Sequence, residues 1–152
     1  MGETAEIIFR EMSSEDIEAA FNIESKVFDI SSVWSLGYFK FRFNRDKTFA
    51  FVAEIDKKIV AYSMIEFKEK IASILKFAVD PNFQGRGIGK KFFSAIIDFI
   101  RQRGGEVVQL HALTDNFPAI NLYESFGLKI TERLKDFYKK THEDGFLMEL
   151  KF

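Results

Sequence analysis

A glycine-rich segment near the middle of the chain has the composition of an anion-binding loop. Residues 84–90 read QGRGIGK, between an apolar run that ends at Val79 and a helical apolar pattern that begins at Ile88. Backbone N–H groups at the start of a helix point outward, and the helix dipole adds positive potential there. Glycines also let the backbone approach a phosphate closely. The segment therefore predicts a binding site for a phosphate-bearing ligand.

The spacing of the glycines separates this loop from two common phosphate-binding loops. The loop of nucleoside triphosphatases requires G-x-x-x-x-G-K-[ST], but position 84 is glutamine and Lys91 stands where serine or threonine would. The dinucleotide loop requires G-x-G-x-x-G, but the glycines here alternate, which leaves Q-x-x-G-x-G. A turn made only for packing is the alternative, although alternating glycines beside Arg86 and Lys90 exceed what a turn requires.

The composition limits the other groups that could do chemistry. The chain has no cysteine and two histidines, His111 and His142. The missing thiols exclude disulfides, zinc–cysteine sites and a cysteine nucleophile. They fit a reducing compartment, so we expect a cytoplasmic protein. Two histidines cannot form a histidine-rich centre, and we predict no metal. Catalysis would then use carboxylates, hydroxyls, backbone amides or one imidazole.

The composition also predicts a single globular domain spanning residues 1–152. Apolar residues make up 47% of the chain and charged residues 30%, which is typical of globular proteins. The net charge of −1 argues against a dedicated nucleic-acid binder. No run approaches the roughly 20 apolar residues of a membrane helix, and the first six residues lack the profile of a signal peptide. We therefore expect neither nucleic acid nor membrane as a partner, and the oligomeric state stays open.

The elements that must position these groups follow from apolar periodicity and from turn residues. Strands are predicted at 7–9, 48–55, 59–67, 72–79, 107–112, 128–134 and 146–151, and helices at 14–28, 36–43, 88–103 and 118–126. The order is β-α-α-β-β-β-α-β-α-β-β, an α/β mixture with a mainly antiparallel start. It places the glycine loop between a continuously apolar strand and the longest helix.

The loop and a second motif together resemble the GNAT N-acetyltransferase superfamily. Residues 79–89 look like its acetyl-CoA loop, and residues 116–127 resemble its N-x-x-A-x-x-x-Y-x-x-x-G segment. The resemblance covers nearly the whole chain. It implies the GNAT fold, with splayed fourth and fifth strands, and direct transfer of an acetyl group from acetyl-CoA to a primary amine. The likeness is greatest to the branch that acetylates protein N-termini and contains the ribosomal-protein alanine acetyltransferase, because residues 33–35 resemble its P-W-S segment and residues 137–138 its aromatic pair.

The resemblance implies where acetyl-CoA binds. Loop amides should hold the pyrophosphate, and the end of the fourth strand should pair with the pantetheine arm and polarise the thioester carbonyl. Asn116 should contact the cofactor, cap the following helix, or do both. The expected contacts with acetyl-CoA are Phe77, Ala78, Val79, Gln84, Gly85, Arg86, Gly87, Ile88, Gly89, Lys90, Asn116 and Tyr123.

Two residues are the candidate catalysts. Tyr123 would protonate the departing CoA thiolate, whose pKa is near 8.5, from a phenol with a pKa near 10; its alternative is a packed core tyrosine. His111 stands five residues before Asn116, where bacterial alanine acetyltransferases carry glutamate and a related eukaryotic branch carries histidine. A neutral imidazole suits removal of a proton from the attacking amine. The alternative is a strand histidine with only local hydrogen bonds.

The acceptor is expected to bind between the second helix and the last hairpin. Trp34, Tyr38 and Tyr138 are its candidate contacts, each with core packing as the alternative. Glu24 is a further acidic candidate but is expected on a solvated helix face, and His142 in a solvated loop. The preferred acceptor is the α-amine of a protein N-terminus. A small amine, such as a polyamine or an antibiotic, and a non-catalytic acyl-CoA sensor are the alternatives.

Overall fold

The computed structural model describes residues 6–152, which form one seven-stranded sheet with helices on both faces. Residues 1–5, where we expect no signal peptide, lie outside the described residues. The strands are β1 (Ile7–Glu11), β2 (Thr48–Ile55), β3 (Lys58–Lys68), β4 (Ile71–Val79), β5 (Val107–Leu113), β6 (Lys129–Tyr138) and β7 (Glu143–Lys151). The helices are α1 (Ile17–Val27), α2 (Leu36–Phe43), α3 (Ile88–Gln102) and α4 (Phe117–Ser125), with short 3-10 turns η1 (Ser14–Asp16) and η2 (Pro81–Phe83).

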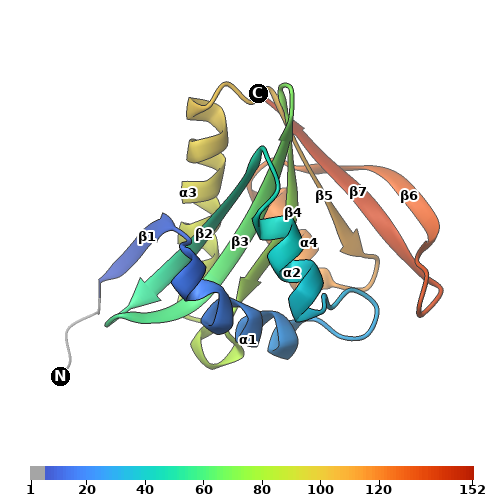
Figure 1. Ribbon diagram of the computed structural model, residues 1–152. Coiled ribbons are helices and arrows are strands. Elements are labelled where there is room, and N and C mark those ends of the chain that lie inside the picture. The colour runs from blue at the N-terminus through green and yellow to red at the C-terminus, as the bar shows by residue number, and fades with distance from the viewer. Residues whose placement is uncertain (1–5) are drawn as a thin grey trace.

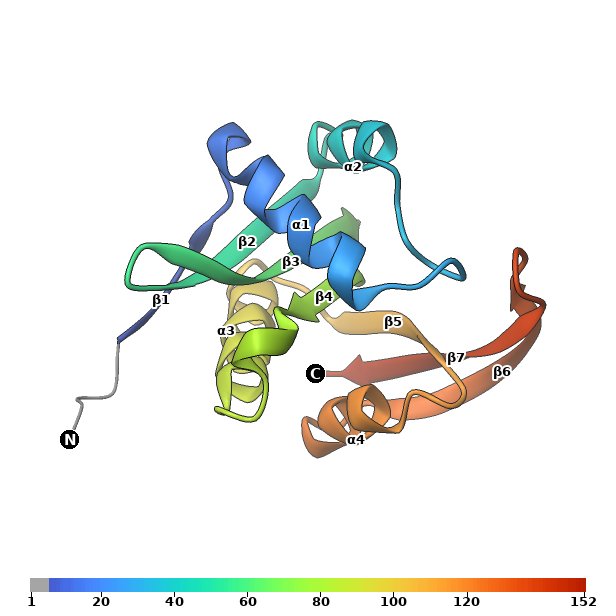
Figure 2. The ribbon, with the colours of Figure 1, turned by 90° about the horizontal axis from the view of Figure 1, so that it is seen from below.

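The sheet has the mixed topology expected of the GNAT fold. Its strand order is β1-β2-β3-β4-β5-β7-β6 (Figure 1). β4 and β5 run parallel, whereas the other neighbouring strands are antiparallel. Helices α1 and α2 cover one face of the sheet, and α3 and α4 cover the other (Figure 2). The predicted fold is therefore confirmed.

The two parallel strands diverge at the centre of the sheet. β4 and β5 pair only over Ile71–Ser73 and Val107–Gln109, and the rest of each strand separates toward the glycine loop (Figure 1). A register shift between β3 and β4 leaves Leu75 without a partner, because Met64 pairs with Lys76 and Ile65 with Ile74. Such a bulge bends a strand and increases its twist. The splay leaves the final part of β4 paired on one side only.

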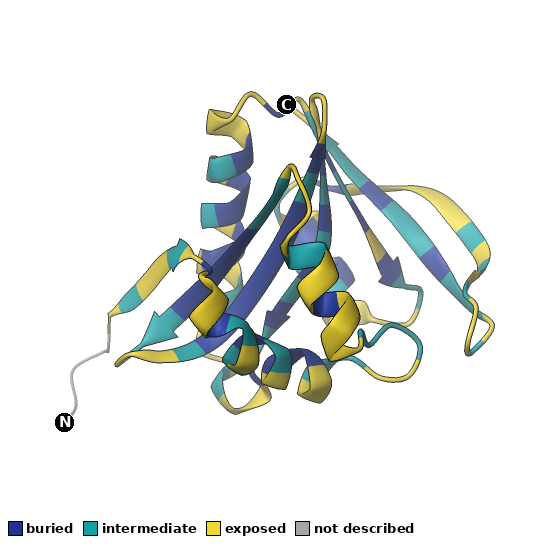
Figure 3. Ribbon diagram, viewed as in Figure 1, coloured by how far each residue is buried: buried dark blue, intermediate teal, exposed yellow. Residues whose placement is uncertain are grey.

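Each face of the sheet has its own apolar core. Buried residues are concentrated in the central strands and on the side of α3 that faces the sheet (Figure 3). The larger core lies under α3, whose buried stripe follows helical spacing. Many of the 19 phenylalanines are used here; for example, Phe93 contacts Phe77 with ring centroids 5.1 Å apart. The smaller core lies under α1 and α2 and includes Phe39 and Tyr62. No helix within residues 6–152 is both long enough and apolar enough to cross a membrane.

The last hairpin is longer than its sequence predicts. β6 continues to Tyr138, past the charged residues that end the predicted strand at Leu134. An edge strand can carry charged residues because one of its sides and one of its faces meet water. A bulge between Leu134 and Tyr138, with Asp136 at a φ of 52°, interrupts the pairing locally. Phe137 and Tyr138 therefore belong to the end of a strand rather than to a loop.

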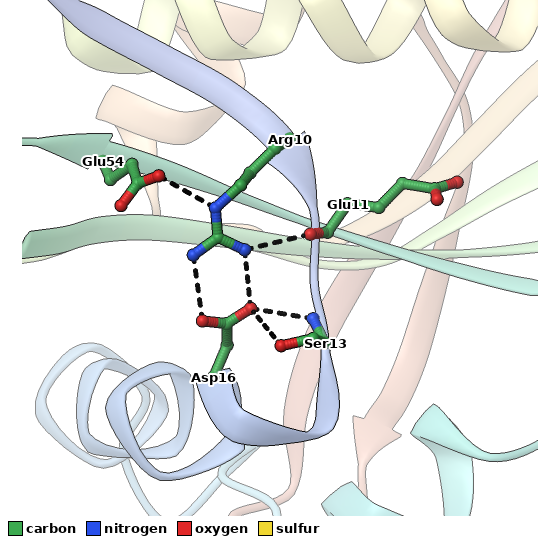
Figure 4. Close-up of polar contacts among 5 residues, drawn as sticks. All are labelled: Arg10, Glu11, Ser13, Asp16 and Glu54. Carbon is green, nitrogen blue, oxygen red and sulfur yellow. Dashed lines mark hydrogen bonds and ion pairs between the residues drawn. The ribbon is translucent and has the colours of Figure 1, made fainter. Parts of the chain in front are cut away.

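The predicted first helix begins with a separate turn that is fixed by ion pairs (Figure 4). The carboxylate of Asp16 accepts a hydrogen bond from the Ser13 amide at 2.7 Å. The Arg10 guanidinium binds the same carboxylate through two nitrogens, at 2.7 and 3.0 Å, and binds Glu54 on β2 at 2.9 Å. One arginine thereby joins β1, β2 and the start of α1.

Asp16→Asn is expected to destabilise the protein by about 1 kcal/mol at pH 7. The hydrogen bonds from Arg10 lower the pKa of Asp16 from 3.8 to about 2, and one pKa unit corresponds to roughly 1.4 kcal/mol. Solvent screening reduces this contribution to stability, because the Arg10 side chain is 37% exposed. A depressed carboxylate pKa stabilises the fold above its unfolded value and loses that effect as the pH falls toward 2. In urea denaturation, the difference in free energy of unfolding between variant and parent should therefore narrow from pH 7 to pH 3. A constant difference would contradict a stabilising role for the ionised Asp16 carboxylate.

Candidate active site

A cleft of about 850 Å³ lies where β4 and β5 separate. Its walls are the α1–α2 loop (residues 28–35), β4, the glycine loop, β5, the start of α4 and the β6–β7 turn. Most of the predicted site residues line it: Trp34, Phe77, Ala78, Val79, Gln84, Gly85, Gly87, Ile88, Gly89, His111, Asn116, Tyr123 and Tyr138. Three predicted residues, Tyr38, Arg86 and Lys90, do not line it.

The glycine loop forms one end of the cleft and presents backbone amides. Gly85 and Gly87 have φ angles of 80° and 77°, which side-chain-bearing residues rarely adopt. Gln84 holds the loop against β4, because its side-chain amide donates to the Val79 carbonyl at 3.2 Å. The hydrogen bond from the Lys91 amide to the Gly87 carbonyl begins α3, so the preceding amides have no intrahelical acceptor. This arrangement fits a pyrophosphate group.

Gly87→Glu is expected to raise the KM for acetyl-CoA by about tenfold or more. The substitution strains a left-handed position at the start of α3, at a cost of about 1–3 kcal/mol, and it places a negative charge where the phosphates would bind. Steady-state kinetics and calorimetry with CoA would measure the change.

Gly104→Glu provides a matched control for that experiment. Gly104 has a φ of 85° and follows the other end of α3, so the same strain and charge arise away from the cleft. This variant should lose stability but keep its affinity for CoA. Equal KM values for acetyl-CoA in Gly87→Glu and Gly104→Glu would contradict the assignment of the glycine loop as the phosphate-binding site.

The unpaired end of β4 continues from the glycine loop along the cleft. Beyond Ser73, β4 has no ladder partner on the side of β5 within the described residues. The side chains of Ser73 and Gln109 close the narrow end of the splay with a hydrogen bond of 3.1 Å. Backbone groups near Phe77–Val79 can therefore pair with an extended ligand, as expected for a pantetheine arm.

Tyr123 lies on α4, Asn116 precedes the first residue of that helix, and both line the cleft. Asn116 is the N-cap of this helix and its side chain accepts from the Ala119 amide at 3.4 Å, while the residue also lines the cleft. The Tyr123 ring packs on Phe93 with centroids 5.2 Å apart. Burial raises the pKa of Tyr123 well above 10, and nearby Tyr138 raises it further. The phenol is therefore protonated at neutral pH.

His111 lies on β5 and lines the cleft. Its side chain is not part of the apolar core under α3. Its neighbours Leu110 and Ala112 are buried under α3 and α4, so the alternation of the strand turns His111 toward the face of α1 and α2. The imidazole stacks on Phe137, with centroids 4.4 Å apart and an interplanar angle of 17°. Partial desolvation lowers the pKa of His111 below 6.5. The imidazole is therefore largely neutral at pH 7. His142 lies in the β6–β7 turn and does not line the cleft.

Glu24 is not on a solvated helix face, which corrects the sequence-based expectation. Its side chain is fully buried under the α1–α2 loop. One carboxylate oxygen accepts from the Trp34 amide at 2.8 Å and lies 3.0 Å from Lys76 Nζ, and the other accepts from the Tyr62 hydroxyl. Burial lowers the pKa of Lys76, and Glu24 partly opposes this shift. A buried charge is stable only with such a partner.

Sequence reasoning missed Lys76, although one signal for it was present. It is the only charged residue in the apolar run of residues 72–79, which was expected to form a central strand. Lysine in such a strand requires a buried partner or access to a cleft. Lys76 has both, because it pairs with Glu24 and lines the cleft.

The aromatic wall of the cleft contains Trp34 but not Tyr38. The Tyr38 ring packs edge-on against Trp34, with centroids 5.2 Å apart, and its hydroxyl accepts from Arg42 at 3.2 Å. Arg42 also binds Glu66 at 3.1 Å, and Glu66 lines the cleft. Tyr38 therefore packs against Trp34 without lining the cleft itself.

Comparison with known proteins agrees with this geometry. Residues 11–128 match the model of the Acetyltransferase (GNAT) family. A [ribosomal protein bS18]-alanine N-acetyltransferase of Salmonella typhimurium is 29% identical over 141 residues, which cover 91% of this chain and 93% of that protein. An uncharacterized N-acetyltransferase of Methanocaldococcus jannaschii is 34% identical over 110 residues, covering 67% of this chain and 48% of its relative, so this chain spans about half of that protein.

A solved structure shows the same relationship. The ribosomal-protein-S18-alanine N-acetyltransferase of Escherichia coli superposes with a TM-score of 0.87 at 25% identity, covering 96% of this chain and 94% of the other. The family match extends over more than half of the chain and contains both the glycine loop and Tyr123. The chain therefore belongs to the GNAT family and is an acetyltransferase.

Proposed function

We propose that the chain transfers the acetyl group of acetyl-CoA to the α-amine of a protein N-terminus. The observation that carries this proposal is the single cleft that joins the glycine loop and Tyr123 to His111, Trp34 and Tyr138. The likeness to bS18-alanine N-acetyltransferases supports the same class of acceptor. The proposed order along the cleft is phosphates at the glycine loop, thioester beside Tyr123, and acceptor between the α1–α2 loop and the β6–β7 hairpin.

His111 and Tyr123 divide the proton transfers between them. Neutral His111 would take a proton from the acceptor ammonium, directly or through water, because an ammonium has no lone pair. The amine then forms the C–N bond as the thioester C–S bond breaks. A backbone amide near Val79 would polarise the carbonyl oxygen. Tyr123 would give its proton to the leaving sulfur and recover one from the nitrogen, which must lose a second proton once the C–N bond has formed. The pKa of the leaving thiol also rises in the same desolvated surroundings.

The charge of the cleft favours a peptide acceptor over a small polyamine. Among its described lining residues, Glu66 is the only carboxylate, and it is already paired with Arg42. A polycation would need several carboxylates to replace its solvation. The lining includes instead the lysines Lys76, Lys139 and Lys140.

A panel of acceptors tests the proposal. Peptides with a free α-amine and an internal lysine, the same peptides with a blocked α-amine, and polyamines would each be incubated with acetyl-CoA. Mass spectrometry should place the acetyl group on the α-amine of the first set only. Acetylation of the polyamines alone would replace the proposal by a small-amine activity. Binding of CoA without transfer to any acceptor would favour a sensor.

A further inference from the structure

The buried ion pair of Glu24 and Lys76 has no part in the proton transfers described above, although it lies against the cleft. The side chains of Glu24 and Lys76 are 0% and 5% exposed. Glu24 is on α1, and Lys76 is at the bulge of β4 just before the segment expected to hold pantetheine. Removing two charges from water costs several kcal/mol per ion before pairing, so a core built only for stability could use apolar residues instead.

The pair attaches the α1–α2 loop at several points. Lys76 Nζ donates to the Ser32 carbonyl at 2.5 Å, and Glu24 accepts from the Trp34 amide at 2.8 Å. The same ammonium lies over two aromatic rings of the loop, 3.9 Å from the centroid of Phe28 and 4.8 Å from that of Trp34. Cation–π contacts of a desolvated ammonium are worth about 2 kcal/mol. The loop has no helix or strand. A turn at residues 30–32, with hydrogen bonds from the Ser32 and Val33 amides to the Asp29 carbonyl, shapes it locally. The contacts of Glu24 and Lys76 join it to α1 and β4.

We propose that Lys76 and Glu24 are positioning residues that hold the α1–α2 loop as the acceptor wall of the cleft. The pair fixes Trp34 opposite Phe137 and Tyr138 while leaving the glycine loop untouched. It therefore controls the binding of the acceptor and not that of acetyl-CoA. This inference rests on the proposed function only in taking this wall to be the acceptor side.

The double variant Lys76→Met/Glu24→Gln tests the proposal without leaving a buried charge unpaired. Both replacements keep the approximate volume of the side chain, and Gln can still accept a hydrogen bond from Trp34. The Ser32 carbonyl loses its donor, and both rings lose the cation. We expect the KM for a peptide acceptor to rise about tenfold, while the KM for acetyl-CoA changes less than about twofold. An unchanged acceptor KM in the folded variant would overturn the proposal, and so would equal rises in both KM values.

A second readout needs no substrate. Trp34 is the only tryptophan of the chain, so its fluorescence reports the loop directly. The double variant should show emission at longer wavelength and stronger quenching by acrylamide than the parent. Unchanged emission and quenching would contradict the proposal that Lys76 and Glu24 hold the α1–α2 loop, even if the chain proves to acetylate another amine. If the spectrum changes but polyamines are the only acceptors, the proposed function would be overturned. The role of Lys76 and Glu24 in holding the loop would still be supported.

Two further variants complete the design. Lys76→Arg keeps the positive charge beside Glu24 but changes the geometry of its contacts with the loop, so it should give a smaller rise in acceptor KM, of about threefold; it serves if the double variant does not fold. Lys70→Met/Glu106→Gln removes an exposed ion pair of 3.0 Å, between the β3–β4 turn and the residue before β5, and is the matched control. This control should leave the Trp34 emission and both KM values unchanged. A rise in acceptor KM in this control as large as that of the double variant would show that the effect is not specific to the buried pair.

Discussion

Tyr123→Phe is expected to lower kcat for acetyl transfer by roughly 10²- to 10⁴-fold, the range typical of a lost general acid. The phenyl ring would keep its contact with Phe93, so the helix and the cleft should retain their shape. The loss would fall on expulsion of the thiolate, because the hydroxyl is the proposed proton donor to the sulfur. The KM for acetyl-CoA should change less than about threefold, since the phosphates bind elsewhere.

The pH profile makes this prediction more specific. Burial and nearby Tyr138 raise the pKa of Tyr123, so its proton is present throughout the neutral range. On the alkaline side, the parent should therefore keep its activity up to pH 10 and lose it above that pH. The variant should have no such alkaline limb. Release of free thiol would measure kcat, and thermal melting would control for folding. A variant with parental kcat would show that Tyr123 only packs in the core and that water protonates the sulfur.

The sequence predicted the fold closely because turn residues mark the ends of its apolar runs. β2 and α2 have the predicted bounds, Thr48–Ile55 and Leu36–Phe43. The glycine loop was predicted with similar accuracy, because alternating glycines before a helix have a local physical cause. Such features depend on neighbours in sequence, and a single chain is sufficient to read them.

Features that depend on distant partners were not predictable in this way. Glu24 is polar on a helix, and polarity alone indicates a solvated face; its burial depends on Lys76, which lies on another element. The position of Phe137 depends on how far β6 follows β7, and charged residues on an edge strand conceal that length. The stacking of His111 on Phe137 combines two strands that are not adjacent in sequence. Sequence spacing alone therefore suggested His111 as the base but did not show that its imidazole stacks on Phe137.

His111→Gln is expected to lower kcat by roughly 100-fold and to remove the acidic limb of the kcat profile. The folded pKa of His111 is lowered below 6.5 by desolvation, so the basic form is present above that value and is lost as the pH falls through it. The parent should therefore lose activity below pH 6.5. His142→Ala, in the hairpin turn at a residue that does not line the cleft, is the control and should leave both kcat and its profile unchanged.

Two neighbouring variants separate a base from a packed histidine. Phe137→Leu removes the ring that stacks on the imidazole, so His111 should regain solvent and the acidic limb should move upward toward 6.5. His111→Glu should retain part of the activity, with a limb moved down toward the carboxylate range near 4.3. An acidic limb that instead lies near pH 8 in the parent and in both variants would belong to the acceptor amine, whose own pKa is near 8. In that case His111 would only shape the wall beside Phe137, and the acceptor would have to bind already deprotonated.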